Sequence, residues 1–292
     1  MSGLWKYAGV IGLMLLVLAL IQVFWSRQVE LDPDSGDLRI VSLAPNITTI
    51  VFSLGLGEQL VGVTSYCDDP PEAQLKTRVG DFIRPNLEMI MSLRPDLILA
   101  EDWPSSRAAR RLRDLGLTVI EFQNPFSIQE IYQLIESVGQ TLGKSEKAAV
   151  LVESMAEKVA TVRERARALP GRPTVYIEND VPTWTIGSPT FTSEAIALCG
   201  ADNIFGDLSH RAPRVSEETI IQRDPDFILS FVASAEQILS RPGWENIEAV
   251  KQARIIDQFE HRLLVRGNHR LADGMLAFQE ILFRQIGISE SK

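Results

Sequence analysis

Two segments of the chain share one pattern, and this repeat constrains the fold more than any other feature. Residues 86–100 read NLEMIMSLRPDLILA and residues 216–230 read SEETIIQRDPDFILS, and the two align without a gap. The first residue of each, Asn or Ser, favours a helix N-cap, the proline ends the helix, and the apolar run after it is typical of a buried strand. A fainter repeat relates residues 48–62 to residues 192–206. Such widely spaced repetition predicts two related halves rather than a solenoid of short repeats.

Short apolar and β-branched runs alternate with helical patterns in both halves. The predicted strands are residues 39–43, 61–64, 97–100 and 118–122 in the first half and residues 174–177, 227–231 and 254–257 in the second. Helical patterns separate them, for example at residues 105–115 and 128–142. This alternation predicts an α/β fold with two Rossmann-like lobes and mostly parallel sheets.

A single long helix is predicted between the halves. Residues 144–169 contain no Gly or Pro, and their apolar side chains recur at spacings of three and four, until Pro170 and Gly171 end the pattern. At ~1.5 Å per residue such a helix is nearly 40 Å long, which is enough to join both lobes. The predicted organisation is a leader and tether at 1–37, an N-terminal lobe at 38–143, a bridging helix at 144–170 and a C-terminal lobe at 171–292.

The N-terminal leader has the length of a membrane span. Residues 8–25 are apolar except for Gln22 and would reach ~27 Å as a helix. Lys6 precedes this run and acidic residues follow it, which favours an extracytoplasmic body, in the periplasm or at the cell surface. A cleaved signal peptide is the alternative, but the run does not end in a small-x-small site. We therefore expect an uncleaved anchor in the cytoplasmic membrane, followed by an acidic tether.

Charge and cysteine content exclude several classes of function. The chain has 29 basic and 38 acidic residues, a net charge of −9, which argues against general nucleic-acid binding. Two cysteines, Cys67 and Cys199, cannot build a disulfide-dense scaffold or a four-cysteine zinc site, and the sequence leaves open whether they pair. The three histidines lack paired metal-ligand spacing, so no resident metal or other cofactor is expected. The segment GQTLGKS at 139–145 has three residues between its glycines, whereas a phosphate-binding loop has four.

Five segments in order resemble a known family. They are RIVSLAPNITTIVFSLGLGEQLVGVTSYCDDPPEA, the first repeat, the long helix, FTSEAIALCGADNIFGD and VSEETIIQRDPDFIL. Together, over about residues 38–286, they resemble the helical-backbone (class III) periplasmic substrate-binding proteins of ABC importers, and most of all the cobalamin-binding branch. The resemblance implies two lobes joined by a rigid helix, a ligand in the cleft between them, and no enzymatic activity. It also implies an ABC permease with its ATPase as the partner, and we expect a monomer.

The resemblance implies the identity of several ligand contacts. The family's aromatic positions match Tyr66, Phe82 and Trp184, and Arg266 matches a cleft arginine. Trp103, in the loop after the strand at 97–100, is a further candidate. Aromatic walls with a few donors suit a corrinoid, which has broad apolar edges and amide arms. For each aromatic side chain the alternative is packing in the core.

The resemblance also implies one permease-docking glutamate in each lobe. The matching residues are Glu88 and Glu218, which occupy equivalent places in the repeat. An exposed carboxylate can form charge-assisted bidentate bonds with an arginine of a partner. Alternatively, both glutamates simply stabilise the first turn of a helix through its dipole.

The expected ligand is cobalamin or a related corrinoid, and the same scaffold could hold haem or a ferric siderophore. His269, close to Arg266 in the sequence, is a candidate for contact with the ligand or its metal. An alternative from another class is a membrane-anchored hydrolase, which needs a carboxylate and a histidine within hydrogen-bond reach in the interlobe cleft. A third possibility is a structural scaffold at the membrane face.

Overall fold

The computed structural model describes residues 38–102, 106–180 and 183–288. The described residues from 39 onward belong to one unit. The expected anchor and tether lie outside the described residues, and so does Trp103. Among the described helices, none combines the length and the apolar character needed to cross a bilayer.

The first sheet is parallel throughout and has the order β3-β2-β1-β4-β5. Its strands are β1 (Ile40–Ser42), β2 (Leu60–Val63), β3 (Thr77–Arg78), β4 (Leu97–Glu101) and β5 (Val119–Phe122). The four strands predicted in this half are confirmed to within one residue at each end. The short strand β3 was not predicted, because two residues carry no periodicity.

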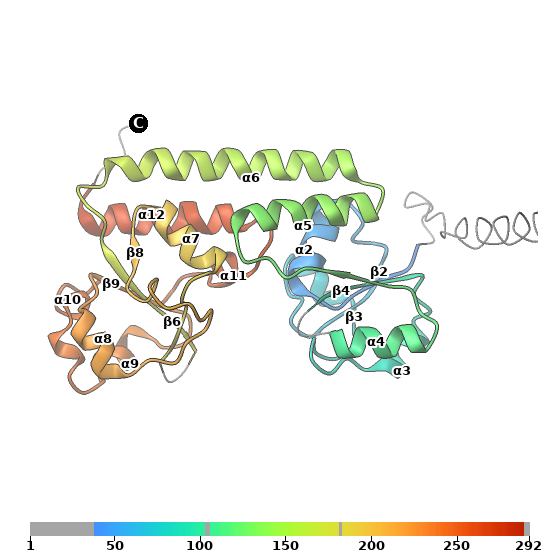
Figure 1. The fold of residues 1–292 in the computed structure, drawn as a ribbon, viewed down its shortest axis with the longest axis horizontal. Coiled ribbons are helices and arrows are strands. Elements are labelled where there is room, and N and C mark those ends of the chain that lie inside the picture. Colours follow the sequence, from blue (N-terminus) through green and yellow to red (C-terminus); the bar gives the residue numbers. More distant parts are fainter. Residues whose placement is uncertain (1–37, 103–105, 181–182, 289–292) are drawn as a thin grey trace, which may run out of the picture. The chain divides into compact units, whose positions relative to one another are not determined.

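Helices cover both faces of the first sheet (Figure 1). They are α2 (Pro45–Ser53) and α5 (Ile128–Thr141) on one face and α3 (Leu87–Ser92) and α4 (Ser106–Asp114) on the other. Ile90 of α3 and Leu112 of α4 join Val41 and Ile98 of the strands in one buried cluster. Successive residues of a strand point to opposite faces of the sheet, and helices cover both faces. These strands are therefore apolar along nearly their whole length. Residues 39–143 around this sheet are called the N-lobe below.

The second sheet has the order β10-β9-β6-β7, and β8 pairs with another part of β6. Its strands are β6 (Thr174–Asp180), β7 (Trp184–Thr185), β8 (Asp202–Asn203), β9 (Phe227–Ser230) and β10 (Ile255–Ile256). Only β7 runs antiparallel to its neighbour, so the sheet is mostly parallel, as predicted. Residues 171–288 around this sheet are called the C-lobe.

Helices also cover both faces of the second sheet (Figure 1). They are α7 (Phe191–Leu198) and α12 (Leu271–Ile286) on one face and α8 (Glu217–Arg223), α9 (Ala235–Leu239) and α10 (Glu248–Lys251) on the other. Tyr176, Ile228 and Trp244 belong to the buried cluster that helices α8, α9 and α10 form with the sheet. A short helix, α11 (Arg262–Val265), precedes α12.

The sequence repeat is a structural repeat. The Asn86 side chain accepts a hydrogen bond from the Met89 N–H at the start of α3, and Ser216 accepts one from Thr219 at the start of α8. Both N-caps are therefore confirmed. A left-handed residue precedes the proline in each repeat: Arg94 (φ 47°), two residues after the end of α3, and Asp224 (φ 40°), directly after α8. Both helices thus end before the proline, which was the expected helix breaker.

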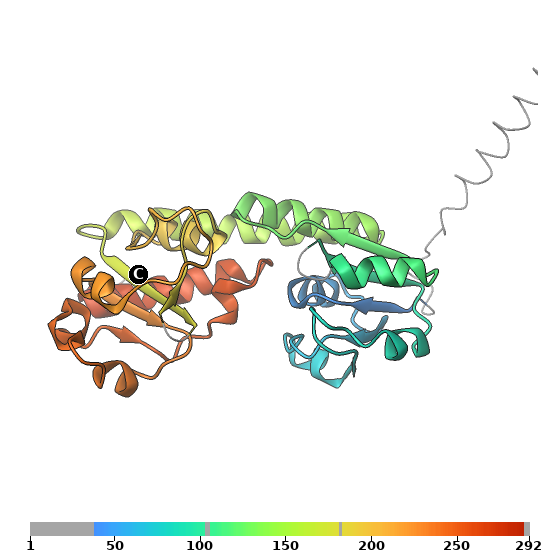
Figure 2. The same ribbon diagram turned by 60° about the horizontal axis from the view of Figure 1, so that its bottom comes forward.

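The long helix predicted at 144–169 is confirmed as α6 (Ser145–Arg165), followed by one short 3₁₀ turn at Ala166–Ala168. Its 21 residues span about 32 Å at ~1.5 Å each. Figures 1 and 2 show α6 lying along α5 of the N-lobe and α12 of the C-lobe. One uninterrupted helix thus packs against helices of both lobes.

Candidate functional site

Loops at the carboxyl ends of the parallel strands come together between the lobes. In parallel α/β sheets these ends are the usual place for a ligand. On the N-lobe side, Tyr66 follows β2 and Asn124 follows β5. On the C-lobe side, residues 257–262 follow β10 and lead into α11. Hydrogen bonds and ion pairs join the two sides, so the cleft is bounded by elements of both lobes.

An open groove of about 510 Å³ lies beside an aromatic pair. Tyr66 is 53% exposed and its ring packs on Phe82, with centroids 5.0 Å apart and planes inclined by 53°. Phe82 is half-buried, and its ring is the packing partner of the exposed Tyr66 ring. The groove is lined by Tyr66, Asp68, Asp257, Gln258, Phe259, Glu260, His261, Arg262 and Arg266. It therefore offers aromatic side chains, Tyr66 and Phe259, and a mixed charged rim.

Arg266 is committed to a contact between the lobes. Its guanidinium lies 2.7 Å from the Asp68 carboxylate and donates a hydrogen bond to the Tyr66 carbonyl oxygen at 3.1 Å. Only 15% of the side chain is exposed. Partial burial would raise the pKa of Asp68, but the nearby Arg266 and Arg262 guanidinium groups hold that pKa below its usual range. Arg266 therefore positions Tyr66 as well as facing the groove.

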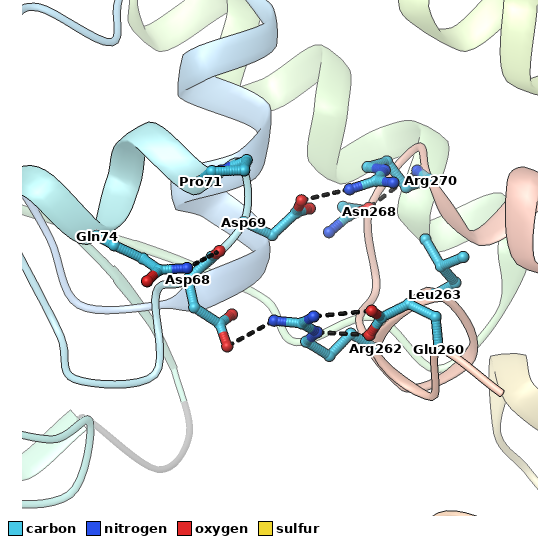
Figure 3. A pocket seen from close by; sticks show the side chains of 9 residues that line it. All are labelled: Asp68, Asp69, Pro71, Gln74, Glu260, Arg262, Leu263, Asn268 and Arg270. Atoms are coloured by element: carbon cyan, nitrogen blue, oxygen red, sulfur yellow. Dashed lines mark hydrogen bonds and ion pairs between the residues drawn. The ribbon is translucent and has the colours of Figure 1, made fainter. Parts of the chain in front are cut away.

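Two further arginines of the C-lobe contact aspartates of the N-lobe (Figure 3). Arg262 lies between Asp68, at 2.7 Å, and Glu260, with which it forms two hydrogen bonds of 2.5 and 2.8 Å. Arg270 contacts Asp69. These side chains surround a small cavity of about 140 Å³. Because each cation here faces a carboxylate, this part of the cleft holds the lobes together and leaves little free charge.

Polar contacts continue deeper in the cleft. The Asn46 amide donates to Glu101 Oε1 at 2.6 Å and to the Gly267 carbonyl oxygen at 3.4 Å. Burial is the main cause of the high pKa of Glu101, about 7. Glu194 of the C-lobe accepts a hydrogen bond of 2.8 Å from the Ile128 N–H at the start of α5. A carboxylate at this position also suits the dipole of α5.

A second cavity, of about 230 Å³, also has walls from both lobes. Asn124, Pro125 and Phe126 line it from the N-lobe, and Arg211 is among the lining residues of the C-lobe. The Arg211 guanidinium lies over the Phe126 ring, 3.0 Å from its centroid. Neither Arg211 nor Phe126 was singled out from the sequence, because no local motif marks a contact between residues so far apart in the chain.

The remaining expected contacts lie elsewhere. Trp184 is 39% exposed on β7, beside Arg214, and lines neither the groove nor the second cavity. Glu88 and Glu218 are both exposed, and each is the second residue of its helix, α3 or α8. The structure thus brings Tyr66, Phe82 and Arg266 together and separates them from Trp184.

The histidines and cysteines occupy varied settings. His261 lines the groove and packs against Phe231, whereas His269 Nε2 lies 3.1 Å from Ser53 Oγ at the lobe contact and lines none of the three cavities above. Cys67 and Cys199 are both free and buried, and burial raises the pKa of each thiol. Within the described ranges, no group of three or more His, Cys, Asp or Glu side chains could hold a metal ion.

Comparison with known proteins gives a consistent result. Residues 40–258 match the family of periplasmic binding proteins. An uncharacterized ABC transporter substrate-binding lipoprotein of Bacillus subtilis is 33% identical over 253 residues, 84% of this chain and 80% of that relative. A vitamin B12-binding protein of Yersinia pestis is 33% identical over 201 residues, 68% of this chain and 70% of that relative.

A solved structure agrees with this assignment. The apo form of a periplasmic heme-binding protein from Roseiflexus superposes with a TM-score of 0.76 and 27% identity, covering 85% of this chain and 98% of that chain. The two chains share an α/β architecture over nearly the whole of the described region. With its parallel sheets and long helix of the class III type, the chain belongs to the periplasmic binding protein family.

Proposed function

We propose that the chain is the extracytoplasmic substrate-binding protein of an ABC importer, and that it captures cobalamin or a related corrinoid between its lobes. The family and the named relatives support a binding role in transport rather than catalysis. The observation that carries the proposal is the groove of about 510 Å³ beside the exposed Tyr66 ring, with walls from both lobes. The ligand is held there unchanged and passed to the permease.

The charge balance of the groove favours a corrinoid over haem. Haem carries two carboxylates, which need free cations, whereas most arms of a corrinoid are neutral amides. The groove cations Arg262 and Arg266 already face Asp68 and Glu260. Ligand carboxylates would have to compete with these partners, which are only partly buried, for the same two guanidinium groups. Haem or a ferric siderophore remains the second candidate, since a heme-binding protein shares the fold.

Docking on the permease is assigned to Glu88 and Glu218. Each carboxylate is exposed at the start of a helix, on equivalent helices of the two lobes. Hydrogen bonds from its own backbone N–H and from Ser216 lower the pKa of Glu218, so this carboxylate is ionised at neutral pH. A pair of ionised carboxylates suits two arginine sites on the permease. In this arrangement the receptor acts as a monomer, anchored by residues 1–37.

Binding measurements test the proposed ligand. The full-length chain in detergent is titrated calorimetrically with cyanocobalamin, haemin and a ferric hydroxamate siderophore. We expect one cyanocobalamin per chain, bound more tightly than the other two. The Tyr66→Ala variant should lose about tenfold in affinity, because its ring is an exposed aromatic contact. Leu75→Ala, an exposed side chain that does not line the groove, is the control. Tight haemin or siderophore binding without cyanocobalamin binding would exclude the corrinoid.

A further inference from the structure

The second interlobe cavity differs chemically from the groove. Eleven residues from both lobes line it, among them Asn124, Phe126, Asn179 and Arg211. One side chain in this set is cationic, Arg211, and none is acidic. The groove, by contrast, carries three carboxylates. The two arginines of the groove already face Asp68 and Glu260, so an anionic group would meet a net attraction in the second cavity but not in the groove.

Arg211 keeps its hydrogen-bond donors available. Among the described residues it forms no ion pair, whereas Arg262, Arg266 and Arg270 each face an aspartate of the N-lobe. The flat face of the Arg211 guanidinium rests on Phe126, so the N–H groups at its edge stay directed outward. Stacking on an aromatic ring orients a guanidinium without using its donors, and a planar guanidinium suits bidentate contact with phosphate oxygens.

The loop that carries Arg211 is held in place. The N–H groups of Thr185, Gly187 and Ser188 donate to carbonyl oxygens of residues 213, 211 and 208, at 3.0, 3.0 and 2.8 Å. A Cβ atom at Gly187 would lie 2.2 Å from the His210 carbonyl oxygen, so glycine is required for this close approach. The position of Arg211 is thus set before a ligand arrives, which lowers the entropy lost on binding.

Neutral donors accompany the cation. The amides of Asn124 and Asn179 line the same cavity, and neither makes a side-chain hydrogen bond within the described part of the chain. The cavity is also close to the groove, because Val265 lines the cavity and the next residue, Arg266, lines the groove. A ligand whose flat body lies against Tyr66 could therefore extend one arm into the second cavity.

We propose that this cavity is the subsite for the phosphodiester arm of the corrinoid, with Arg211 donating to its phosphate oxygens and Asn124 and Asn179 to neighbouring polar atoms. The inference rests on the proposed function and extends it to the part of the ligand that carries a negative charge. A phosphodiester has one formal charge, which matches the single unpaired cation of the cavity.

Two corrinoids that differ in this arm test the proposal. Cyanocobalamin contains the phosphodiester and its nucleotide, and dicyanocobinamide lacks both. The affinities of full-length wild type, Arg211→Gln and Arg214→Gln are measured by calorimetry. We expect R211Q to weaken cyanocobalamin binding about 10- to 100-fold, since a charge-assisted hydrogen bond is lost, and to leave dicyanocobinamide binding nearly unchanged. Arg214, exposed two positions after Ala212 and outside the cavity lining, is the matched control and should affect neither ligand.

The possible outcomes separate the two proposals. Equal loss for both corrinoids, or no loss for either, overturns the subsite, because Arg211 then acts on the fold or not at all. Wild type that binds neither corrinoid overturns the proposed function itself, and that result does not depend on any variant. Circular dichroism verifies folding. If R211Q does not fold, Asn179→Ala and Arg211→Lys replace it in the test. Each should weaken cyanocobalamin binding by a smaller factor and leave dicyanocobinamide binding nearly unchanged.

Discussion

His269 shows how the position of a side chain in the fold changes its role. The sequence suggests a ligand contact because His269 is close to Arg266. The structure instead places it against Ser53, at the contact between the lobes. Burial, outweighing the opposing charge of Asp273, lowers the pKa of His269 to about 4. Arg270, Asp69 and Lys158 act more weakly on the same ring. The partner residue is 216 positions away, so no sequence pattern could reveal this contact.

The low pKa of His269 predicts that this histidine destabilises the fold as the pH falls. Between pH 6.5 and about 4 the unfolded chain binds a proton at this histidine and the folded chain does not. The contribution of His269 to the free energy of unfolding therefore decreases as the pH falls through this range, by roughly 2 kcal/mol between pH 7.5 and pH 5. Glu101, with its raised pKa of about 7, contributes with the opposite sign, so the comparison of wild type with the variant isolates the histidine. His269→Gln should remove this part of the pH dependence, as measured by urea unfolding at both pH values. His210→Gln, at an exposed histidine, is the control, and an unchanged pH dependence in H269Q would contradict the assignment.

At the level of elements, the repeat predicts more than the helices and strands themselves. Asp96 accepts a hydrogen bond of 2.8 Å from the N–H of Arg39, the residue before β1. Asp226, its counterpart, accepts bonds of 2.8 Å from the N–H and hydroxyl of Thr174 at the start of β6. The aspartate that follows the shared proline thus links the turn after each repeated helix to the start of the first strand of its lobe by hydrogen bonds. Sequence periodicity finds long helices and central strands, but it misses β7 and β8, whose two residues are fixed by tertiary pairing.

Gly139 provides a test of how α5 and α6 pack. This glycine lies inside α5, where GQTLGKS superficially suggests a phosphate-binding loop. A Cβ atom at Gly139 would lie 2.3 Å from the Cβ of Ala148 on α6, so the two helices approach more closely than alanine allows. Gly139→Ala should lower the free energy of unfolding by about 1–3 kcal/mol, although alanine is the better helix former by ~1 kcal/mol. Urea unfolding measures the change.

The control for Gly139→Ala is the same substitution at Gly171, a glycine that follows α6. A Cβ atom at Gly171, after α6, would meet no atom within 4 Å, and its backbone does not have a positive φ. Gly171→Ala should therefore leave the free energy of unfolding unchanged within ~0.5 kcal/mol or raise it slightly. If Gly139→Ala instead raises the free energy of unfolding, helices α5 and α6 can move apart at little energetic cost.

At the scale of the whole molecule, the sequence predicts the two repeats and the helix between them, but not how the lobes meet. The repeat and the uninterrupted pattern at 144–169 are local signals, and α6 confirms the helix. The contacts of Asp68 with Arg262 and Arg266 join residues about 200 positions apart, and they become visible only in three dimensions. These contacts and the continuous α6 restrict relative motion of the lobes, because bending a helix disrupts its hydrogen bonds.

Restricted motion would let the two proposed docking glutamates act together. If Glu88 and Glu218 are held by one stiff body, binding at the first arginine site places the second carboxylate at high effective concentration near its own site. Each single replacement by alanine should then weaken binding to the cognate permease about 10- to 100-fold and leave cyanocobalamin affinity unchanged. Permease in nanodiscs on a biosensor surface measures the first quantity, and calorimetry the second. Glu153→Ala, at an exposed glutamate of α6, is the control. If E88A and E218A instead reduce ligand affinity and dock normally, the two glutamates belong to the ligand site and the docking surface lies elsewhere.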